Sequence, residues 1–103
     1  MNIAQIAKMA QQMQSQMAQV QDELANETVE ASAGGGMVTV KATGSGEIKE
    51  IKIDPKAIDP DDPEFLEDAV LAAVNEALRS AQSLAESKMG SMTGLGGLGL
   101  PGL

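Results

Sequence analysis

Four carboxylates crowd one short stretch of the chain, and their spacing could support chemistry. They are Asp59, Asp61, Asp62 and Glu64, which together could hold a divalent cation. The stretch lacks the glycine at position six and the glutamate at position twelve of a calcium-binding loop. Carboxylates are also favoured at a helix N-terminus, where they accept from free N–H groups and face the positive end of the helix dipole. The helix-cap interpretation is therefore favoured, and no metal site is predicted.

Two glycine-rich stretches are further candidates for chemistry. Gly34-Gly35-Gly36 precedes a predicted strand and lacks the Lys-Ser/Thr pair of a P-loop, which favours a hairpin turn over a phosphate-binding loop. Ser45 lies between two glycines, but the chain has no histidine to activate it as a nucleophile. The chain also has no Cys or Tyr and a single Arg. With so few catalytic groups, we predict no catalytic residue, no cofactor and no enzymatic activity.

The informative polar side chains lie in the first 21 residues, which hold Lys8 and no carboxylate. The fifteen carboxylates, which give the chain a net charge of −8, all lie between residues 22 and 86. The polar residues that follow helical spacing in this acid-free segment are Gln5, Lys8, Gln12, Ser15, Gln16 and Gln19. Glutamine amides donate to phosphates and to base edges. This face is therefore a candidate nucleic-acid interface, although an ordinary solvated surface is an alternative.

The elements that must position this face begin with a long helix. Apolar residues recur with steps of three and four, which predicts a helix of about 23 residues and ~35 Å. They are Ile3, Ile6, Ala10, Met13, Met17, Val20 and Leu24. The helix is longer than a small domain needs, so it should project or pair with a second copy. The seam residues predicted to form the core or a dimer contact are Ile6, Met13, Met17, Val20 and Leu24.

Residues 27–53 switch to a period of two, with glycine turns at 34–36 and 44–46. This pattern predicts a three-stranded antiparallel meander with one apolar face. The residues expected on that face are Val29, Ala31, Ala33, Val38, Val40, Ala42, Ile51 and Ile53. Ile48 is out of phase with Ile51, so we expect a bulge or one exposed isoleucine there. The opposite face should be solvated, since it carries Glu30, Thr39, Lys41, Glu50 and Lys52.

A second helix is predicted from Pro63 to Lys88, capped by an aspartate and ended by Gly90. Its expected buried stripe is Leu66, Val70, Val74, Ala77, Ala81 and Leu84, widened by Phe65, Ala73 and Leu78. The order of elements predicts an α+β fold, with one domain over residues 1–89 and an uncharged Gly/Leu-rich tail over 90–103. No run of about 18 apolar residues and no signal-peptide pattern is found, so a cytoplasmic protein without membrane contact is expected.

Four stretches carry a family resemblance. They are MAQQMQSQMAQVQDEL, VEASAGGGMVTVKATGSGEIKEIKIDP, DPEFLEDAVLAAVNEALRSAQSL and MTGLGGLGLPGL. Over almost its whole length the chain resembles the YbaB/EbfC family of bacterial nucleoid-associated proteins. The resemblance implies an intertwined, tweezers-like homodimer that straddles duplex DNA with low sequence specificity, organises the nucleoid and affects gene expression. The contact residues it implies are Gln5, Lys8, Gln12, Gln16 and Gln19, with Arg79 and Lys88 of the second helix.

A second function is kept as an alternative. The Met-rich first helix and the Leu-Gly tail could form a protein-interaction module that acts with a replication or recombination protein. The net charge of −8 favours this alternative, because contacts with phosphates come from Lys and Arg.

Overall fold

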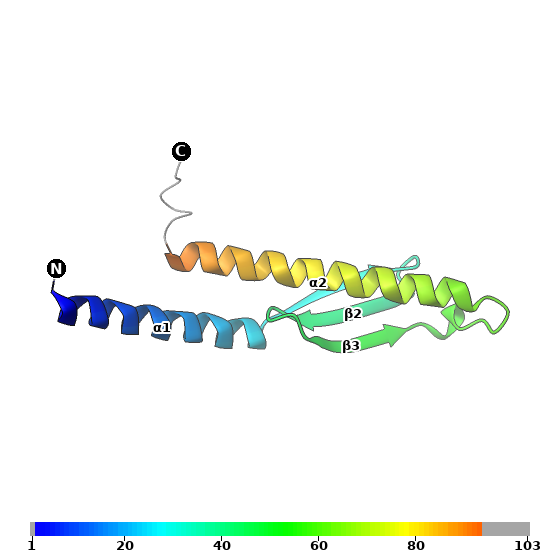
Figure 1. The fold of residues 1–103 in the computed structure, drawn as a ribbon. Helices are drawn as coiled ribbons and strands as arrows, with labels where there is room; N and C mark the ends of the chain where they lie inside the picture. Colours follow the sequence, from blue (N-terminus) through cyan, green and yellow to red (C-terminus); the bar gives the residue numbers. More distant parts are fainter. Residues whose placement is uncertain (1, 94–103) are drawn as a thin grey trace, which may run out of the picture.

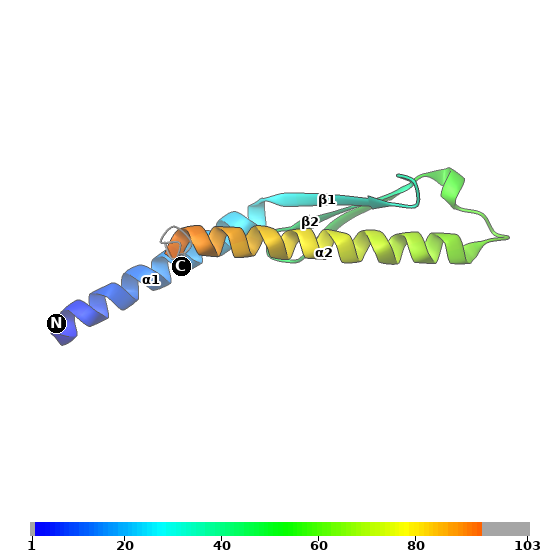
Figure 2. The same ribbon diagram turned by 90° about the horizontal axis from the view of Figure 1, so that it is seen from above.

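The structure is a computed structural model that describes residues 2–93. Its elements are α1 (Ile3–Asn26), β1 (Thr28–Ala33), β2 (Val38–Thr43), β3 (Ile48–Ile53), the 3₁₀ turn η1 (Pro55–Ala57) and α2 (Pro63–Thr93). The three strands form one antiparallel sheet in the order β1-β2-β3. Helix α2 packs along one face of this sheet, while α1 extends beyond it (Figure 1, Figure 2). The predicted α+β meander is thus confirmed; residues 94–103 of the predicted tail lie outside the described residues.

Helix α1 forms as the heptad pattern predicted, over 24 residues. It begins with a capping box, in which the Asn2 side chain accepts a hydrogen bond from the Gln5 backbone N–H at 2.8 Å and the Gln5 side chain accepts one from the Asn2 N–H. Only Val20 and Leu24 of this helix are buried. The chain therefore measures 70 × 28 × 16 Å, with a radius of gyration of 19.5 Å. A compact domain of this length has about 13 Å, so the single chain is strongly extended.

The core lies between β2 and α2. Val38, Val40 and Ala42 point from β2 toward α2 and are completely buried, as their alternation predicted. The register places Glu50 opposite Lys41 and Ile48 opposite Ala42, which leaves Lys49 as the extra residue of a bulge. The bulge brings Ile48 against the core. The sequence-based expectation of a bulge at this position is confirmed.

Strand β3 departs from the predicted apolar face. Ile51 and Ile53 pair with Val40 and Val38, so they lie on the core face of the sheet. Helix α2 packs on β1 and β2, however, and Ile51 remains 45% exposed. The expectation that these isoleucines are buried is therefore wrong for the single chain, because one helix is too narrow to cover three strands.

The buried stripe of α2 is made of alanines, which confirms the predicted Ala73, Ala77 and Ala81, adds Ala69 and corrects the larger residues of the predicted stripe. The completely or almost completely buried residues are Ala69, Ala73, Ala77 and Ala81. Leu66, Val70 and Val74 flank them and are only partly buried. Small side chains let the helix axis approach the sheet closely, and the larger ones are pushed to the sides of the contact. Phe65 is 40% exposed at the start of the helix.

The prediction for the N-terminal end of α2 is confirmed, and the prediction for its C-terminal end is wrong. The Asp62 carboxylate accepts from the Phe65 N–H at 3.3 Å, and that of Asp59 accepts from the Asp61 N–H at 2.9 Å. The acidic stretch therefore serves the turn and the helix cap, as expected. Gly90 does not end the helix, which continues to Thr93. A glycine costs only ~1 kcal/mol inside a helix, and no proline follows until position 101 to enforce an end.

The β1–β2 turn requires glycine for two separate reasons. Gly34 and Gly35 both have left-handed φ values, +64° and +69°, which side chains disfavour. At Gly34 an added Cβ would also lie 3.0 Å from the Ala69 Cβ, whereas nothing lies within 4 Å at Gly35. Only the first of the two glycines therefore touches α2.

We expect Gly35→Ala to lower the free energy of unfolding by about 1 kcal/mol, the cost of a left-handed alanine. Gly34→Ala should cost about 1 to 2 kcal/mol more, because it also pushes α2 off the sheet. Urea denaturation at one protein concentration measures both values. Equal losses in the two variants would contradict the close approach of α2 at Gly34.

Candidate nucleic-acid interface

The feature that stands apart from the rest of the molecule is the arm, which we define as residues 2–19. Every one of these residues is exposed, and they extend along α1 away from the body of the chain, by which we mean the sheet and α2 (Figure 1). The arm carries one charged side chain, Lys8, and no carboxylate. Lys8 makes no ion pair with the residues that the structure describes. Its ammonium group is therefore available to an external anion.

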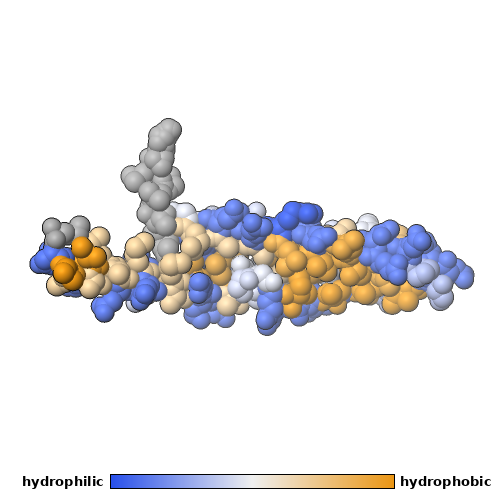
Figure 3. Space-filling view, in the orientation of Figure 1, coloured by the Kyte–Doolittle hydropathy of each residue, from blue (hydrophilic) through white to orange (hydrophobic). Residues whose placement is uncertain are grey.

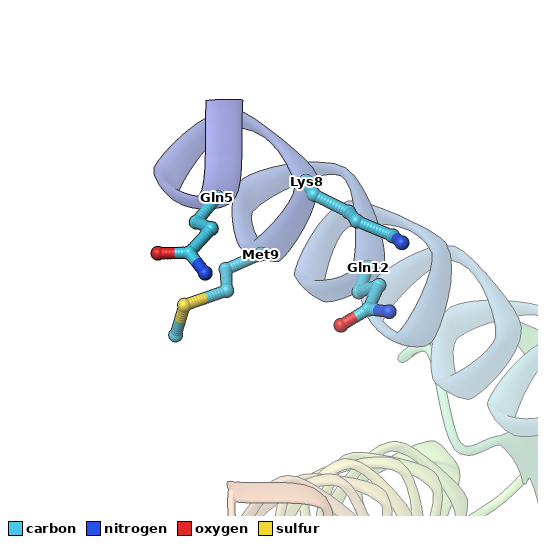
Figure 4. Close-up of a pocket in the computed structure, with 4 residues that line it drawn as sticks. All are labelled: Gln5, Lys8, Met9 and Gln12. Atoms are coloured by element: carbon cyan, nitrogen blue, oxygen red, sulfur yellow. The ribbon is translucent and has the colours of Figure 1, made fainter. Parts of the chain in front are cut away.

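Polar side chains gather around Lys8 in two shallow depressions. One is lined by Gln5, Lys8, Met9 and Gln12 (Figure 4). The other is lined by Lys8, Gln11, Gln12, Ser15 and Gln16. The arm thus brings four of the predicted contact residues onto a continuous surface, while Gln19 is exposed at its base. Gln11 was not among the predicted residues, although its position three residues after Lys8 and four before Ser15 places it on the same helical face.

The apolar seam of α1 divides into two parts. Val20 and Leu24 are buried in the core of the chain. Ile6 and Met13 lie on the arm and are 54% and 57% exposed, and Met17 is exposed as well. The arm therefore has an uncovered apolar stripe beside its polar surface, as the orange and pale-orange atoms at this end of Figure 3 indicate.

The two predicted contact residues of α2 are both paired with carboxylates. The Arg79 guanidinium donates to the Glu76 carboxylate one turn away, at 2.9 and 3.2 Å. The Lys88 ammonium lies 2.8 Å from an oxygen of Glu27 and 3.7 Å from one of Glu23. Arg79 forms an exposed ion pair within α2. The ion pairs of Lys88 instead join α2 to the last turn of α1 and its C-cap. The structure brings neither cation to the polar surface of the arm.

The contact of Lys88 with α1 changes its acid–base behaviour. The hydrogen bond to Glu27 raises the pKa of Lys88, and the negative charges of Glu23 and Glu27 raise it further; partial burial opposes them. A raised pKa means that the folded protein holds this proton more tightly than the unfolded chain does. The ion pairs therefore stabilise the contact between α1 and α2 at neutral pH.

A close backbone contact holds the root of the arm, which we define as residues 20–27. The Gly44 N–H donates to the carbonyl oxygens of Leu24 at 2.9 Å and Glu27 at 3.0 Å, where α1 ends. A Cβ at Gly44 would lie 2.7 Å from a methyl of Leu24 and 3.1 Å from one of Leu84. The β2–β3 turn, the end of α1 and helix α2 therefore meet at this glycine.

Other site chemistries find no support in the described part of the chain. Residues 2–93 contain no group of three or more acidic, Cys or His side chains placed to hold a metal ion. Within the same residues, no helix has the length and hydrophobicity that a membrane crossing requires.

Comparisons with known proteins identify the family and the fold of the chain. Residues 1–97 match the model of the YbaB/EbfC DNA-binding family. The chain is 54% identical to a nucleoid-associated protein of Saccharopolyspora erythraea, over 99% of this chain and 94% of that one. It is 56% identical to a nucleoid-associated protein of Acetivibrio thermocellus, over 99% and 89%. A crystal structure of an uncharacterized Helicobacter pylori protein shares the fold, with a TM-score of 0.82, 22% identity, and coverage of 91% of this chain and 99% of that one.

The raised pKa of Lys88 leads to a pH-dependent prediction. Lys88→Gln should lower the free energy of unfolding at pH 7 to 9, where the wild-type side chain is charged in both the folded and unfolded states. The difference from wild type should shrink as the pH rises beyond about 10.4 and through the raised value of the folded protein. Urea midpoints measured at pH 7, 9 and 11 follow this change. Lys56→Gln serves as the control, because Lys56 is exposed and forms no ion pair within residues 2–93. A difference that persists unchanged at pH 11 would contradict the ion pair.

Proposed function

The chain belongs to the YbaB/EbfC DNA-binding family, and we propose that it binds duplex DNA as a homodimer with low sequence specificity. In this role it organises the nucleoid, within the cytoplasm, and thereby affects gene expression. The observation that carries the proposal is the acid-free arm, with Lys8 among glutamines on a chain whose net charge is −8. The alternative role as an interaction module gains nothing from the family match, which is to DNA-binding proteins.

The acidic body does not prevent contact between the arm and DNA. Asp22 is the first carboxylate after Lys8, fourteen residues along the same helix, which corresponds to about 21 Å. The Debye length is about 8 Å at physiological ionic strength, so exposed charges this far apart are largely screened. A duplex that touches the arm therefore experiences the local charge of Lys8 more than the net charge of the chain.

The composition of the arm supports weak discrimination between sequences. Lys8 and the surrounding glutamine amides donate hydrogen bonds, and phosphate oxygens accept them wherever they lie on the duplex. The arm has no arginine for a bidentate contact with guanine and no aromatic side chain to insert between bases. Contacts with phosphates fix the position of a protein on DNA and carry little sequence information, and the base that the glutamine amides of the arm are suited to read is adenine, through its N6 and N7.

The uncovered face of β3 supports the homodimer. Ile51 and Ile53 lie on the core face of the sheet beyond the reach of α2, and Ile58, which follows β3 in the chain, is 58% exposed. Apolar side chains gather over the α2 and β3 part of the molecule in Figure 3. A second copy that packs on this surface removes it from water and places two arms on one assembly. Two arms double the number of phosphate contacts that a single duplex receives.

Lys8→Glu should weaken binding to a 30-base-pair duplex by about tenfold or more, because reversal removes one phosphate contact per arm and adds repulsion. The wild-type dimer should show a shallow dependence of log K on log salt, with a slope of about −2 from its two Lys8 side chains. Fluorescence anisotropy at several salt concentrations measures both quantities. Asp61→Asn, in the turn before α2, should bind like wild type. Unchanged binding by Lys8→Glu would refute the proposed contact surface.

Ile51→Glu should convert the dimer to monomer at a concentration of about 10 µM, because a buried unpaired carboxylate costs at least about 2 kcal/mol. Sedimentation velocity measures the oligomeric state. Thr39→Glu introduces the same charge on the opposite face of the sheet and should leave the dimer intact. If Ile51→Glu remained dimeric, the dimer contact would have to lie elsewhere.

A further inference from the structure

The arm is attached to the body over a very short length. Val20 and Leu24, one turn apart, are the only buried residues of α1. Every residue from 2 to 19 is exposed, and Met17, at 37%, is the only exposed large hydrophobic residue of this range with less than half of its surface open. The Gly44 N–H fixes the end of α1 at the carbonyls of Leu24 and Glu27. The two apolar side chains lie on one stripe and resist sideways rotation of the helix about that point poorly, since dispersion contacts have little directionality.

The length of the arm amplifies any motion at its root. From Leu24 to Gln5 the helix rises about 28 Å. A change of 10° in the direction of α1 would therefore move Gln5 by about 5 Å, more than the 3.4 Å that separates successive phosphates of one strand along the duplex axis. The position of the polar surface thus depends on whatever fixes the angle of α1 at its last two turns.

Lys88 is placed to fix this angle. It projects from α2 and contacts Glu23 and Glu27, which are one turn apart at the end of α1. Its side chain is 28% exposed, compared with 68% for Arg79. The two carboxylates flank the stripe that carries Val20 and Leu24, so Lys88 adds a directional contact beside an apolar one.

We infer that the Lys88–Glu23–Glu27 cluster sets the direction of the arm, and that Lys88 is a positioning residue for DNA binding. The inference rests on the proposed function, because it assigns the DNA contact to the arm. The implied direct contact between Lys88 and phosphate is the competing explanation for any loss of binding when Lys88 is changed. A direct contact with phosphate would require Lys88 to break its ion pairs with Glu23 and Glu27 when DNA binds.

A charge swap separates the two explanations. Lys88→Glu places a third carboxylate beside Glu23 and Glu27 and should release the arm. The double variant Glu27→Lys/Lys88→Glu rebuilds the pair with its charges exchanged and keeps the net charge of −8. Lys56→Glu is the matched control, since it makes the same charge change at an exposed lysine that belongs to neither the root nor the arm.

The direction of the arm is measured without DNA. The chain has no cysteine, so Gln14→Cys and Glu67→Cys accept spin labels at two chosen sites, one on the arm and one on α2. Double electron–electron resonance, with labelled chains diluted in unlabelled ones, reports the distance between them within one chain. We expect a single narrow distribution for wild type and Lys56→Glu. Lys88→Glu should broaden or shift it by about 5 Å, and the double variant should restore it.

Binding to the duplex completes the test. Lys88→Glu should bind about tenfold more weakly than wild type, clearly below Lys56→Glu. The double variant should recover to within about twofold, with the salt slope of wild type. A double variant that restores the distance but not the affinity, and whose salt slope is lowered, would overturn the inference in favour of a direct phosphate contact. Unchanged distances in Lys88→Glu would also overturn it.

The two proposals fail separately. If Lys8→Glu binds as well as wild type, the proposed contact surface on the arm is wrong, whatever the spin-label distances are. If Lys8→Glu loses binding while Lys88→Glu binds like Lys56→Glu, the contact surface is retained and the positioning role is refuted.

Discussion

The contact between the alanine face of α2 and the buried side chains of β2 determines the shape of the whole chain. Ala73 and Ala77 are fully buried, as are Val38 and Val40. Such small side chains bring helix and sheet close together, but they bury little area per residue. The resulting two-layer body is thin, and a single helix covers only β1 and β2. The exposed isoleucines of β3 and the uncovered arm follow directly from this geometry.

Charged side chains are distributed unevenly between the body and the arm. Within the described residues, the carboxylates lie on the body and around the root of the arm, while the arm itself has only Lys8. On the open face of the sheet, Lys41 lies 3.9 Å from both Glu30 and Glu50. The two carboxylates compensate the charge of Lys41 locally, and such exposed pairs contribute little stability. Lys8 differs because its neighbours on the helix are amides and apolar groups, so its charge is not compensated.

The sequence was sufficient to predict the elements, because their signals are local. The 3-4 spacing from Ile3 to Leu24 specified α1, and the glycine turns with period-two alternation specified the meander and its bulge. The exposure of Ile51 was not predictable, because alternation identifies a face of a sheet but not the width of the helix that covers it. The buried stripe of α2 was predicted in part, since it includes the expected Ala73, Ala77 and Ala81 but also Ala69. Hydrophobicity favours Leu66 and Val74 as core residues, whereas close packing selects Ala69 and leaves the larger side chains only partly buried.

The polar side chains of the arm were predictable from the sequence, whereas the contacts at its root were not. Glutamines and a lysine at helical spacing are visible in the sequence, but a lysine on α2 gives no sign of the partner it meets 61 residues earlier. Only the three-dimensional arrangement shows that Lys88 reaches Glu27. Gly44 is similar, since a glycine between two strands is expected to serve a turn. Its contact with the end of α1 is a tertiary feature.

The bulge at Lys49 has a consequence for how the protein avoids aggregation. β3 is an edge strand with apolar side chains, and such a strand offers its free N–H and C=O groups to any other extended chain. The extra residue interrupts the regular spacing of these groups, and it carries a positive charge that would be costly to enclose between sheets. The β3 edge is thereby protected against uncontrolled growth of β-structure.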